Sequence, residues 1–235
     1  MHTELLPYTH EDEDFDVFLV RPDGDEPRPA VLICHMWGGR EGFIEDKARA
    51  LAKLGYVAAG IDLYGVGQRG TDVASSRALM TALVTQPAVL RSRLAKAHAV
   101  VRDAHGVDPE RMGAIGYCFG GLCAILMARM GLPLRSVVSF HGLLKIGEPL
   151  DAEVQAQIMV QHGQDDPMVP PSDVGTFAEE MKRINADWQL HSYPGVVHGF
   201  TNPKANDPAF GTVYDEDAAR RSWIEMRRFF EDTLG

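Results

Sequence analysis

The sequence of 235 residues contains few cysteines, and their arrangement excludes two common stabilising crosslinks. Cys34, Cys118 and Cys123 are odd in number and show no C-x-x-C spacing. Neither a disulfide framework nor a zinc site of the usual spacing is therefore indicated. No group of histidines or cysteines has metal-ligand spacing either, so we expect no metal and no cofactor.

Positive charge and long apolar runs are also scarce. Lysine plus arginine number 23 against 33 for aspartate plus glutamate, which gives a net charge of −10. This charge repels phosphate backbones and anionic lipid, and no apolar run approaches the roughly 20 residues of a membrane span. The N-terminus carries Glu4 and an acidic cluster at Glu11–Asp14, where a signal peptide has a basic start. We therefore expect a cytoplasmic monomer or small homo-oligomer that binds a small molecule, not nucleic acid or membrane.

What the sequence does contain is the apolar content of a packed domain. Hydrophobic residues make up 45% of the chain and charged residues 24%, which is ordinary for a globular protein. Strand-like and helix-like segments alternate, which is typical of an α/β fold with a mostly parallel central sheet and helices on both faces. We expect residues 1–235 to form a single domain of this class.

The hydrophobic pattern places the individual elements. The predicted strands are Phe15–Val20, which alternates as an edge strand does, Ala30–His35, Tyr56–Tyr64, a run ending at Tyr117, Ser136–Phe140, Gln157–His162 and Trp188–Tyr193. The predicted helices are Ile44–Leu54, Ala74–Val84, Val89–His105, Leu122–Met130, Pro171–Asn185 and Asp215–Asp232.

The segment from Gly116 to Gly120 has the spacing G-x-C-x-G between a predicted strand and a predicted helix. This is the nucleophile-elbow pattern of α/β-hydrolases, with the sulfur of Cys118 in place of a serine oxygen. Glycine is needed at both flanks because strand and helix approach so closely that a side chain would clash. The positive end of the helix dipole also favours a thiolate at this place. By itself, the pattern fits a small buried cysteine beside a structural glycine turn equally well.

A cysteine nucleophile needs a base, and the base needs a carboxylate that orients it. Asp165 and Asp166 directly follow one predicted strand, and His198 follows the last one. The chain order cysteine, aspartate, histidine is the order of the α/β-hydrolase fold and differs from that of other triad folds. The sequence therefore predicts an α/β-hydrolase fold with Cys118 and His198 in its active site.

These motifs resemble those of the dienelactone hydrolase family, whose elbow reads G-Y-C-x-G-G and whose acid segment reads G-x-x-D-x-x-V-P. The second motif matches Gly163, Asp166, Val169 and Pro170. The resemblance thus selects Asp166, not Asp165, as the orienting carboxylate of a triad with Cys118 and His198.

The resemblance also covers the loop His35–Gly39, the strand end at Tyr64 and Trp223 in the last helix, and so extends over nearly the whole chain. It implies a carboxymethylenebutenolidase-like hydrolase that cleaves a small carboxylic ester or lactone through a thioester on Cys118.

An ester carbonyl under attack develops an oxyanion, which needs two N–H donors. The backbone N–H groups of Phe119, directly after the nucleophile, and of Trp37, in the glycine-rich loop after an early strand, are the candidates. A substrate pocket is expected at the strand ends on the same side of the sheet. Its predicted lining residues are His35, Met36, Tyr64, His141 and Phe200.

The sequence departs from the best-known family members at two places. Their glutamate next to the nucleophile is replaced by Met36, and no arginine follows His198. At least one charge-assisted clamp for a substrate carboxylate is therefore missing. Arg40, Arg69 and Arg77 are the arginines in nearby loops and helices that either supply a cation or lie solvated on the surface.

Two alternative functions were weighed against hydrolysis. The segment Gly65–Gly70 satisfies G-x-G-x-x-G, but it opens no helix directly and no strand ending in an acidic residue follows, so dinucleotide binding is disfavoured. The second alternative is a catalytically weak binding or redox-sensing protein of the same fold that uses Cys118 as an oxidisable thiol.

Overall fold

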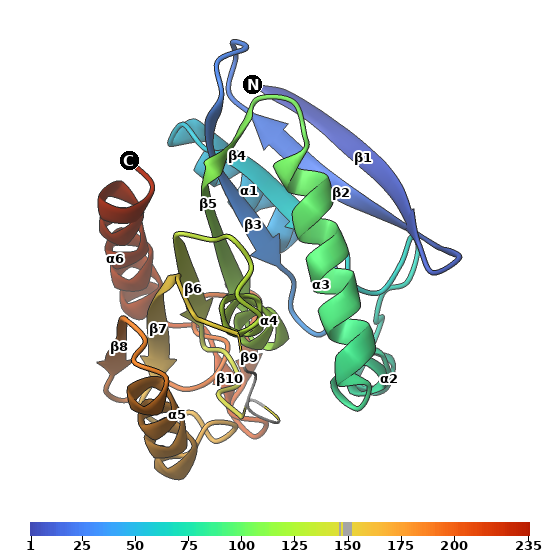
Figure 1. Ribbon diagram of the computed structural model, residues 1–235. Coiled ribbons are helices and arrows are strands. Elements are labelled where there is room, and N and C mark those ends of the chain that lie inside the picture. The colour runs from blue at the N-terminus through green and yellow to red at the C-terminus, as the bar shows by residue number, and fades with distance from the viewer. Residues whose placement is uncertain (146, 148–151) are drawn as a thin grey trace.

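The computed structural model describes residues 1–145, 147 and 152–235, and a twisted sheet of eight strands runs through it (Figure 1). The strands are β1 (His2–His10), β2 (Glu13–Arg21), β3 (Arg28–Cys34), β4 (Val57–Ile61), β5 (Val107–Tyr117), β6 (Ser136–Phe140), β7 (Gln157–Gly163) and β8 (Trp188–Tyr193). Their order across the sheet is β1-β2-β4-β3-β5-β6-β7-β8. β2 is antiparallel to both of its neighbours, whereas every pair from β4 to β8 is parallel.

Helices connect the parallel strands. They are α1 (Gly42–Lys53), α2 (Val73–Val84), α3 (Pro87–Arg102), α4 (Phe119–Arg129), α5 (Pro171–Arg183) and α6 (Glu216–Thr233), and a short hairpin of β9 (Asn206–Asp207) and β10 (Thr212–Val213) precedes α6. Among the described residues, no helix combines the length and apolarity that crossing a bilayer requires.

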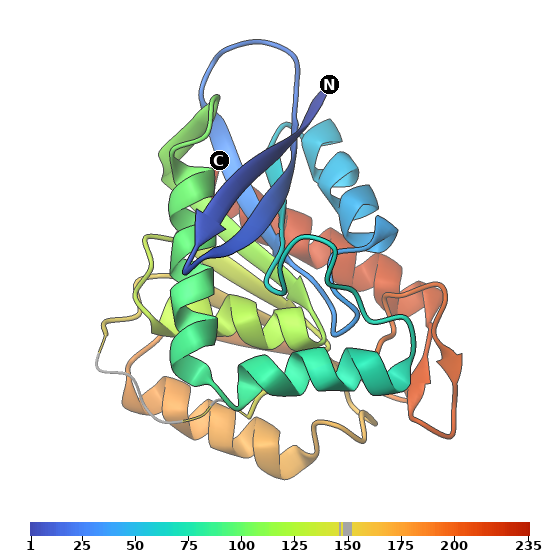
Figure 2. The ribbon, with the colours of Figure 1, turned by 90° about the vertical axis from the view of Figure 1, so that its right-hand side faces the viewer.

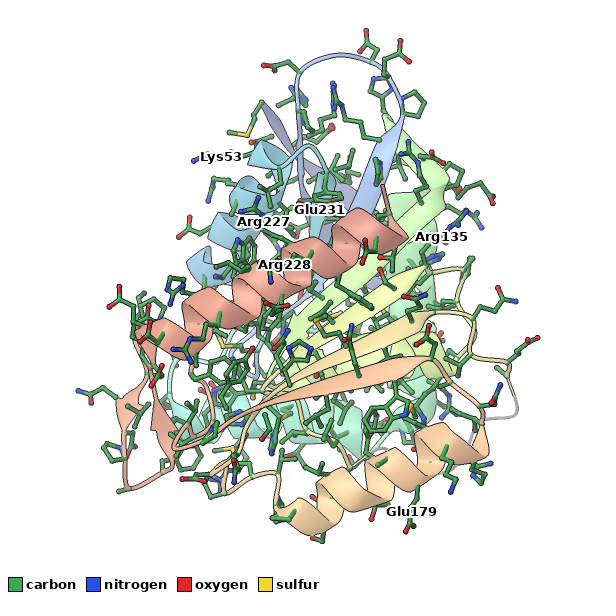
Figure 3. The ribbon with its side chains drawn as sticks, turned by 90° about the vertical axis from the view of Figure 1, so that its left-hand side faces the viewer. Lys53, Arg135, Glu179, Arg227, Arg228 and Glu231 are labelled. Carbon is green, nitrogen blue, oxygen red and sulfur yellow. The ribbon has the colours of Figure 1, made fainter. Side chains whose placement is uncertain are left out.

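Two hydrophobic layers hold these helices to the sheet. On one face, α1 and α6 pack on the strands through residues such as Leu51 and Phe230. Figure 3 shows α6 lying across this face, with the exposed Arg227, Arg228 and Glu231 on it. The opposite face is covered by α3, α4 and α5. The prediction of an α/β-hydrolase fold, with a mostly parallel sheet and helices on both faces, is confirmed.

The N-terminal edge of the sheet differs from the prediction. The segment Phe15–Val20 belongs to β2. Because β1 pairs with the outer side of β2 and forms the edge of the sheet, the prediction that Phe15–Val20 is an edge strand was wrong. β1 was not predicted because it contains Pro7 and a charged residue, features that are typical of an edge strand and weaken the strand signal.

The parallel strands β3 to β8 all end at the same edge of the sheet, which brings the residues that follow them together. After β4 the chain continues into α2 and α3, which run in clearly different directions on either side of Pro87 (Figure 2). α2 therefore lies beside the carboxyl ends of the strands, whereas α3 packs along the sheet.

Candidate active site

The turn between β5 and α4 is the most constrained part of the site. Cys118 joins the two elements with φ of 56° and ψ of −117°, a left-handed conformation that is costly for a residue with a side chain. A Cβ atom on Gly116 would overlap the backbone of Gly120, and one on Gly120 would overlap the carbonyl group of Cys34. The two glycines are thus required by the close approach of three backbone segments. Cys118 is half-buried, whereas Cys34 and Cys123 are fully buried.

The acid and the base come from the loops that follow β7 and β8. The Nδ1 atom of His198 lies 2.7 Å from Oδ2 of Asp166, and both residues are 3% exposed. The other carboxylate oxygen, Oδ1, accepts a hydrogen bond from the Met168 N–H at 2.8 Å. Asp165 is exposed and donates its own N–H to the Val196 carbonyl at 3.0 Å, and among the described residues no hydrogen bond or ion pair joins its side chain to His198. The structure therefore places Asp166 next to the base and Asp165 in the turn.

The Asp166 contact fixes the protonation of His198. Because Oδ2 is an acceptor, Nδ1 carries the proton of this contact, and Nε2 is the ring nitrogen that does not face Asp166. Burial by itself lowers the pKa of His198, but the negative charges of Cys118 and Asp166 outweigh it and raise the pKa to about 10. Nε2 is buried, and among the groups that raise this pKa Cys118 has the largest effect. With this raised pKa, the imidazole of His198 is protonated at neutral pH.

Two backbone N–H groups are available beside the sulfur. Phe119 is the first residue of α4, and the first N–H groups of a helix have no acceptor within the helix. The N–H of Trp37 donates to no acceptor in the part of the chain that the structure describes. Trp37 lines the same cavity as Cys118.

A cavity of 410 Å³ opens above Cys118 and His198. Met36 and Trp37 form one part of its wall, and the Trp37 ring stacks on Phe210 with 5.8 Å between ring centroids. Other parts of the wall are mostly apolar and come from several segments: Val73 and Met80 of α2, Leu143, and Met168. This volume is sufficient for a small ester or lactone.

Three predicted lining residues lie behind the cavity wall instead of on it. His35 is fully buried beneath the loop that carries Trp37, and Tyr64 uses its hydroxyl to donate to the Trp37 carbonyl at 2.9 Å. Phe200 is also fully buried and packs against the ring of His141, with centroids 5.3 Å apart. Because these residues follow strand ends, they lie at the predicted edge of the sheet. Their side chains, however, pack behind the residues that line the cavity. Met36 and His141 do line the cavity.

The ring of His141 contacts that of His198 directly. Its ring lies edge-on to that of His198, with centroids 5.1 Å apart, and its Nε2 is 2.8 Å from the hydroxyl of Thr201. Burial, followed by the nearby charge of His198, holds its pKa well below the usual range, so His141 is neutral at neutral pH. Its backbone has a positive φ of 38°. A neutral ring on a strained backbone therefore forms the wall beside His198.

The arginines near the site have different surroundings. Arg40 pairs with Asp16 and Glu45, and Arg69 pairs with Asp62. Arg77 is exposed on α2, lines the cavity, and has no ion-pair partner among the described residues.

Arg77 and its α2 neighbours Val73 and Met80 were not predicted as a group on the cavity wall. Their i, i+4 and i+7 spacing on one helix face was the available signal. The sequence contained nothing to show which way that face turns.

No metal or dinucleotide site is apparent in the described ranges. No group of three or more metal-ligating side chains lies together in them. The segment Gly65–Gly70 forms an irregular loop with positive φ at Gly65 and Gly67, and α2 begins only at Val73 after its cap Asp72. Its glycines therefore do not open a helix as a phosphate-binding loop would.

Comparisons with known proteins agree with this geometry. A sequence model of the dienelactone hydrolase family matches residues 15–234. The crystal structure of a dienelactone hydrolase-like promiscuous phosphotriesterase, P91, from metagenomic libraries superimposes with a TM-score of 0.94. It is 30% identical in sequence, and the match covers 100% of this chain and 99% of that one.

Two further relatives are similar over most of their length. The solved structure m3DLH has a TM-score of 0.94 and 31% identity over 100% of this chain and 99% of that one. A Bradyrhizobium protein named "Probable 2-oxo-3-(5-oxofuran-2-ylidene)propanoate lactonase" is 31% identical over 219 residues, which are 88% of this chain and 84% of the relative.

Proposed function

Because the chain belongs to the dienelactone hydrolase family and is a hydrolase, we propose that it cleaves a small carboxylic ester or lactone with Cys118 as the nucleophile. One observation carries the proposal: the buried Asp166–His198 pair, 2.7 Å apart, stands beside a half-buried thiol that is held in a strained turn at a helix N-terminus. This arrangement has the parts of a nucleophile, a base and an orienting carboxylate.

The acylation half of the reaction uses these groups in order. The sulfur of Cys118 attacks the carbonyl carbon as a thiolate, its proton having passed to Nε2 of His198. Electrons from the carbonyl π bond move to oxygen, and the N–H groups of Trp37 and Phe119 stabilise the resulting oxyanion. When the tetrahedral intermediate collapses, Nε2–H protonates the departing alkoxide, and a thioester remains on Cys118. For a lactone, the alcohol stays attached to the acyl group.

Deacylation runs through the same groups in reverse. His198, now neutral, removes a proton from water, and the hydroxide adds to the thioester carbonyl. The same two N–H groups stabilise the second oxyanion. Its collapse breaks the carbon–sulfur bond and releases the carboxylic acid, while the thiolate and imidazolium are restored. Asp166 keeps the imidazole in the required tautomer and stabilises its positive charge in both halves.

Turnover of short p-nitrophenyl esters by cysteine variants tests this function. Cys118→Ala should lose turnover by a factor on the order of 10⁴ or more, because no other group can take the acyl chain. Cys34→Ala and Cys123→Ala should keep most of it, since both thiols are buried away from the cavity. A protein that uses Cys118 only as a redox sensor would show at most one stoichiometric acylation and no steady-state release.

The cavity favours a small, largely apolar acyl or alcohol group. Its wall next to the nucleophile carries the thioether of Met36 and the indole of Trp37, while Arg77 is the cation at its rim. We propose that Arg77 binds the carboxylate of substrates that have one, as a single clamp. Replacing Arg77 with alanine should therefore remove the preference for esters that carry a carboxylate over neutral esters.

A neutral phosphotriester is a second candidate substrate. The similar structure P91 is described as a promiscuous phosphotriesterase. In this chain Met36 places no negative charge next to the sulfur, so a phosphoryl oxygen would meet the two N–H donors without repulsion from position 36. Steady-state release of p-nitrophenol from diethyl p-nitrophenyl phosphate would support this activity, and a single stoichiometric burst would oppose it.

The proposal also includes the cellular compartment and the size of the substrate. The three cysteines are free, which suits a reducing compartment, and we place the protein in the cytoplasm for that reason. The substrate is a small molecule that fits the 410 Å³ cavity.

A further inference from the structure

The loop Met36–Arg40, which carries the Trp37 N–H, has no regular secondary structure. An oxyanion donor must be aimed within a few tenths of an ångström, and a glycine-rich loop does not hold such an orientation by itself. The neighbouring His35 directly follows β3 but is not on the cavity wall. Its contacts account for the orientation of the loop.

The two ring nitrogens of His35 face opposite kinds of partner. Nδ1 lies 2.7 Å from the carbonyl oxygen of Met36, which can only accept a hydrogen bond. Nε2 lies 3.2 Å from the backbone nitrogen of Leu63, which can only donate. His35 therefore carries its single proton on Nδ1 and joins the end of β3 to the segment after β4.

The Met36 carbonyl receives a second donor from its own loop. The Gly39 N–H donates to the same oxygen at 3.0 Å, so two hydrogen bonds fix the peptide unit between Met36 and Trp37. In a trans peptide, the C=O and the N–H of one unit point in opposite directions. Holding the Met36 oxygen against His35 therefore turns the Trp37 N–H away from His35, which is not among the residues that line the cavity shared by Trp37 and Cys118.

Packing and charge keep His35 in this single state. The ring is fully buried, 4.6 Å from the ring of Tyr64 and 6.1 Å from that of Phe119, centroid to centroid. Burial lowers its pKa to about 4, although the hydrogen bond to Met36 and the charge of Asp62 act in the opposite direction. At neutral pH the ring is uncharged, and Nε2 keeps the lone pair that the Leu63 N–H requires.

The segment Tyr64–Gly70 holds the rest of the loop. The Tyr64 hydroxyl donates to the carbonyl of Trp37 at 2.9 Å, and the Gly70 N–H donates to that of Gly38 at 3.0 Å. Nε of Arg69 donates to the carbonyl of Arg40 at 2.7 Å. The segment Gly65–Gly70, which resembled a dinucleotide loop, thus has a structural role, because Arg69 and Gly70 in it donate to two carbonyls of the Trp37 loop.

We propose that His35 is a positioning residue of the oxyanion hole, which aims the Trp37 N–H by holding the Met36 carbonyl. This inference rests on the proposed function, because it assumes that the Trp37 N–H stabilises an ester oxyanion. It differs from a purely structural role in one measurable respect. Reactions of Cys118 that form an oxyanion depend on His35, and reactions that form none do not.

Two reactions of the same sulfur separate these roles. Acylation by p-nitrophenyl acetate, followed as the pre-steady-state release of p-nitrophenol, passes through an oxyanion. Alkylation by iodoacetamide is a displacement at carbon that forms no oxyanion and reports the reactivity of the thiolate. Both rate constants are measured for the native protein, for His35→Leu and for His35→Asn, whose side chains are nearly the same shape but differ in the amide donor.

The expected result is a selective loss. His35→Leu should lower the acylation rate constant by about 10- to 100-fold, less than the roughly 10²- to 10³-fold cost of deleting an oxyanion donor, while alkylation changes less than about twofold. His35→Asn keeps a donor near the Nδ1 position and should restore most of the acylation rate. His98→Leu, which changes a buried histidine on α3 outside the site, should leave the ratio of the two rates unchanged.

Other outcomes overturn the inference. Equal loss of acylation and alkylation in His35→Leu would mean that the residue only supports the fold, and equal acylation in the leucine and asparagine variants would exclude the hydrogen bond. If the leucine variant does not fold, His35→Phe keeps a ring against Tyr64 without a donor and must show the same selective loss. Absence of steady-state ester turnover in the native protein would refute the proposed function itself, which is a separate result.

Discussion

The proposed catalytic groups and the cavity wall that faces them are built in different ways. Cys118, Asp166 and His198 follow β5, β7 and β8, and each is held by backbone contacts or by a short hydrogen bond. The α2 residues that line the cavity make fewer fixed contacts by comparison. Val73 is 55% exposed, and Arg77 has no ion-pair partner in the described part of the chain.

This difference separates reaction chemistry from substrate choice. The proposed triad should tolerate little change, because strand ends, glycine contacts and buried charges fix it together. The α2 residues that line the cavity are constrained mainly by their own helix, so they can change without disturbing the sheet. Mutations should therefore have large effects on every substrate at the triad, and smaller, substrate-dependent effects at the wall.

The largest effect is expected at the orienting carboxylate. Asp166→Asn should lower kcat by about 10⁴-fold for all esters, because an amide nitrogen facing His198 allows the wrong imidazole tautomer. Asp165→Asn is the matched control, since Asp165 is exposed and should leave kcat within about twofold of the native value. Steady-state assays with two unrelated esters check the prediction. A damaging Asp165→Asn would show that the acid has been assigned one residue too late.

The next effect is on folding at the elbow. Gly116→Ala should lower the free energy of unfolding by about 4 kcal/mol or more, because the added Cβ would overlap the Gly120 backbone and neither strand nor helix can move away. Gly175→Ala, in the exposed part of α5 with open space around it, should instead raise it by roughly 0.5–1 kcal/mol through helix propensity. Urea denaturation measures both. Native stability in Gly116→Ala would contradict the close packing described for this turn.

The contrast between triad and wall also explains what the sequence could predict. Gly116, Cys118 and Gly120 lie within five residues. The close backbone approach that requires the two glycines can therefore be recognised from their spacing in the sequence alone. Asp166 was separable from Asp165 only through the spacing of the family motif, and the structure places Asp166 2.7 Å from His198.

Side-chain direction was the part that could not be predicted. Tyr64 and Phe200 follow strands at the catalytic edge, yet they point into the second layer, because whether a side chain faces the cavity depends on backbone turns that residue order does not reveal. For the same reason α2 was predicted as a helix while its cavity-lining residues were not identified.

A smaller and substrate-dependent effect is expected at Arg77. Arg77→Ala should lower kcat/KM for esters that carry a carboxylate by about tenfold, the cost of one partly solvated charged contact, and leave neutral esters unchanged. Arg228→Ala removes the same charge from an exposed position on α6 and controls for net charge (Figure 3). Equal losses for charged and neutral esters would show that Arg77 acts on the fold of α2 and not on the substrate.

The smallest effect is expected at Met36. A carboxylate introduced by Met36→Glu would lie on the cavity wall with Cys118 and disfavour the thiolate by like-charge repulsion. Alkylation by iodoacetamide near neutral pH should slow by about three- to tenfold, while Met36→Gln, of similar shape and no charge, should not change it. Superimposable pH profiles of alkylation for the two variants would mean that position 36 has no electrostatic influence on the nucleophile.

The central claim is that Cys118 carries the acyl group during turnover. Rapid acid quench of the native protein during hydrolysis of p-nitrophenyl butyrate, followed by peptide mapping by mass spectrometry, tests it most directly. We predict a single butyryl group on the peptide that contains Cys118, formed as fast as the p-nitrophenol burst and removed by hydroxylamine. Steady turnover with no acylated peptide, or with the butyryl group on another residue, would contradict the account.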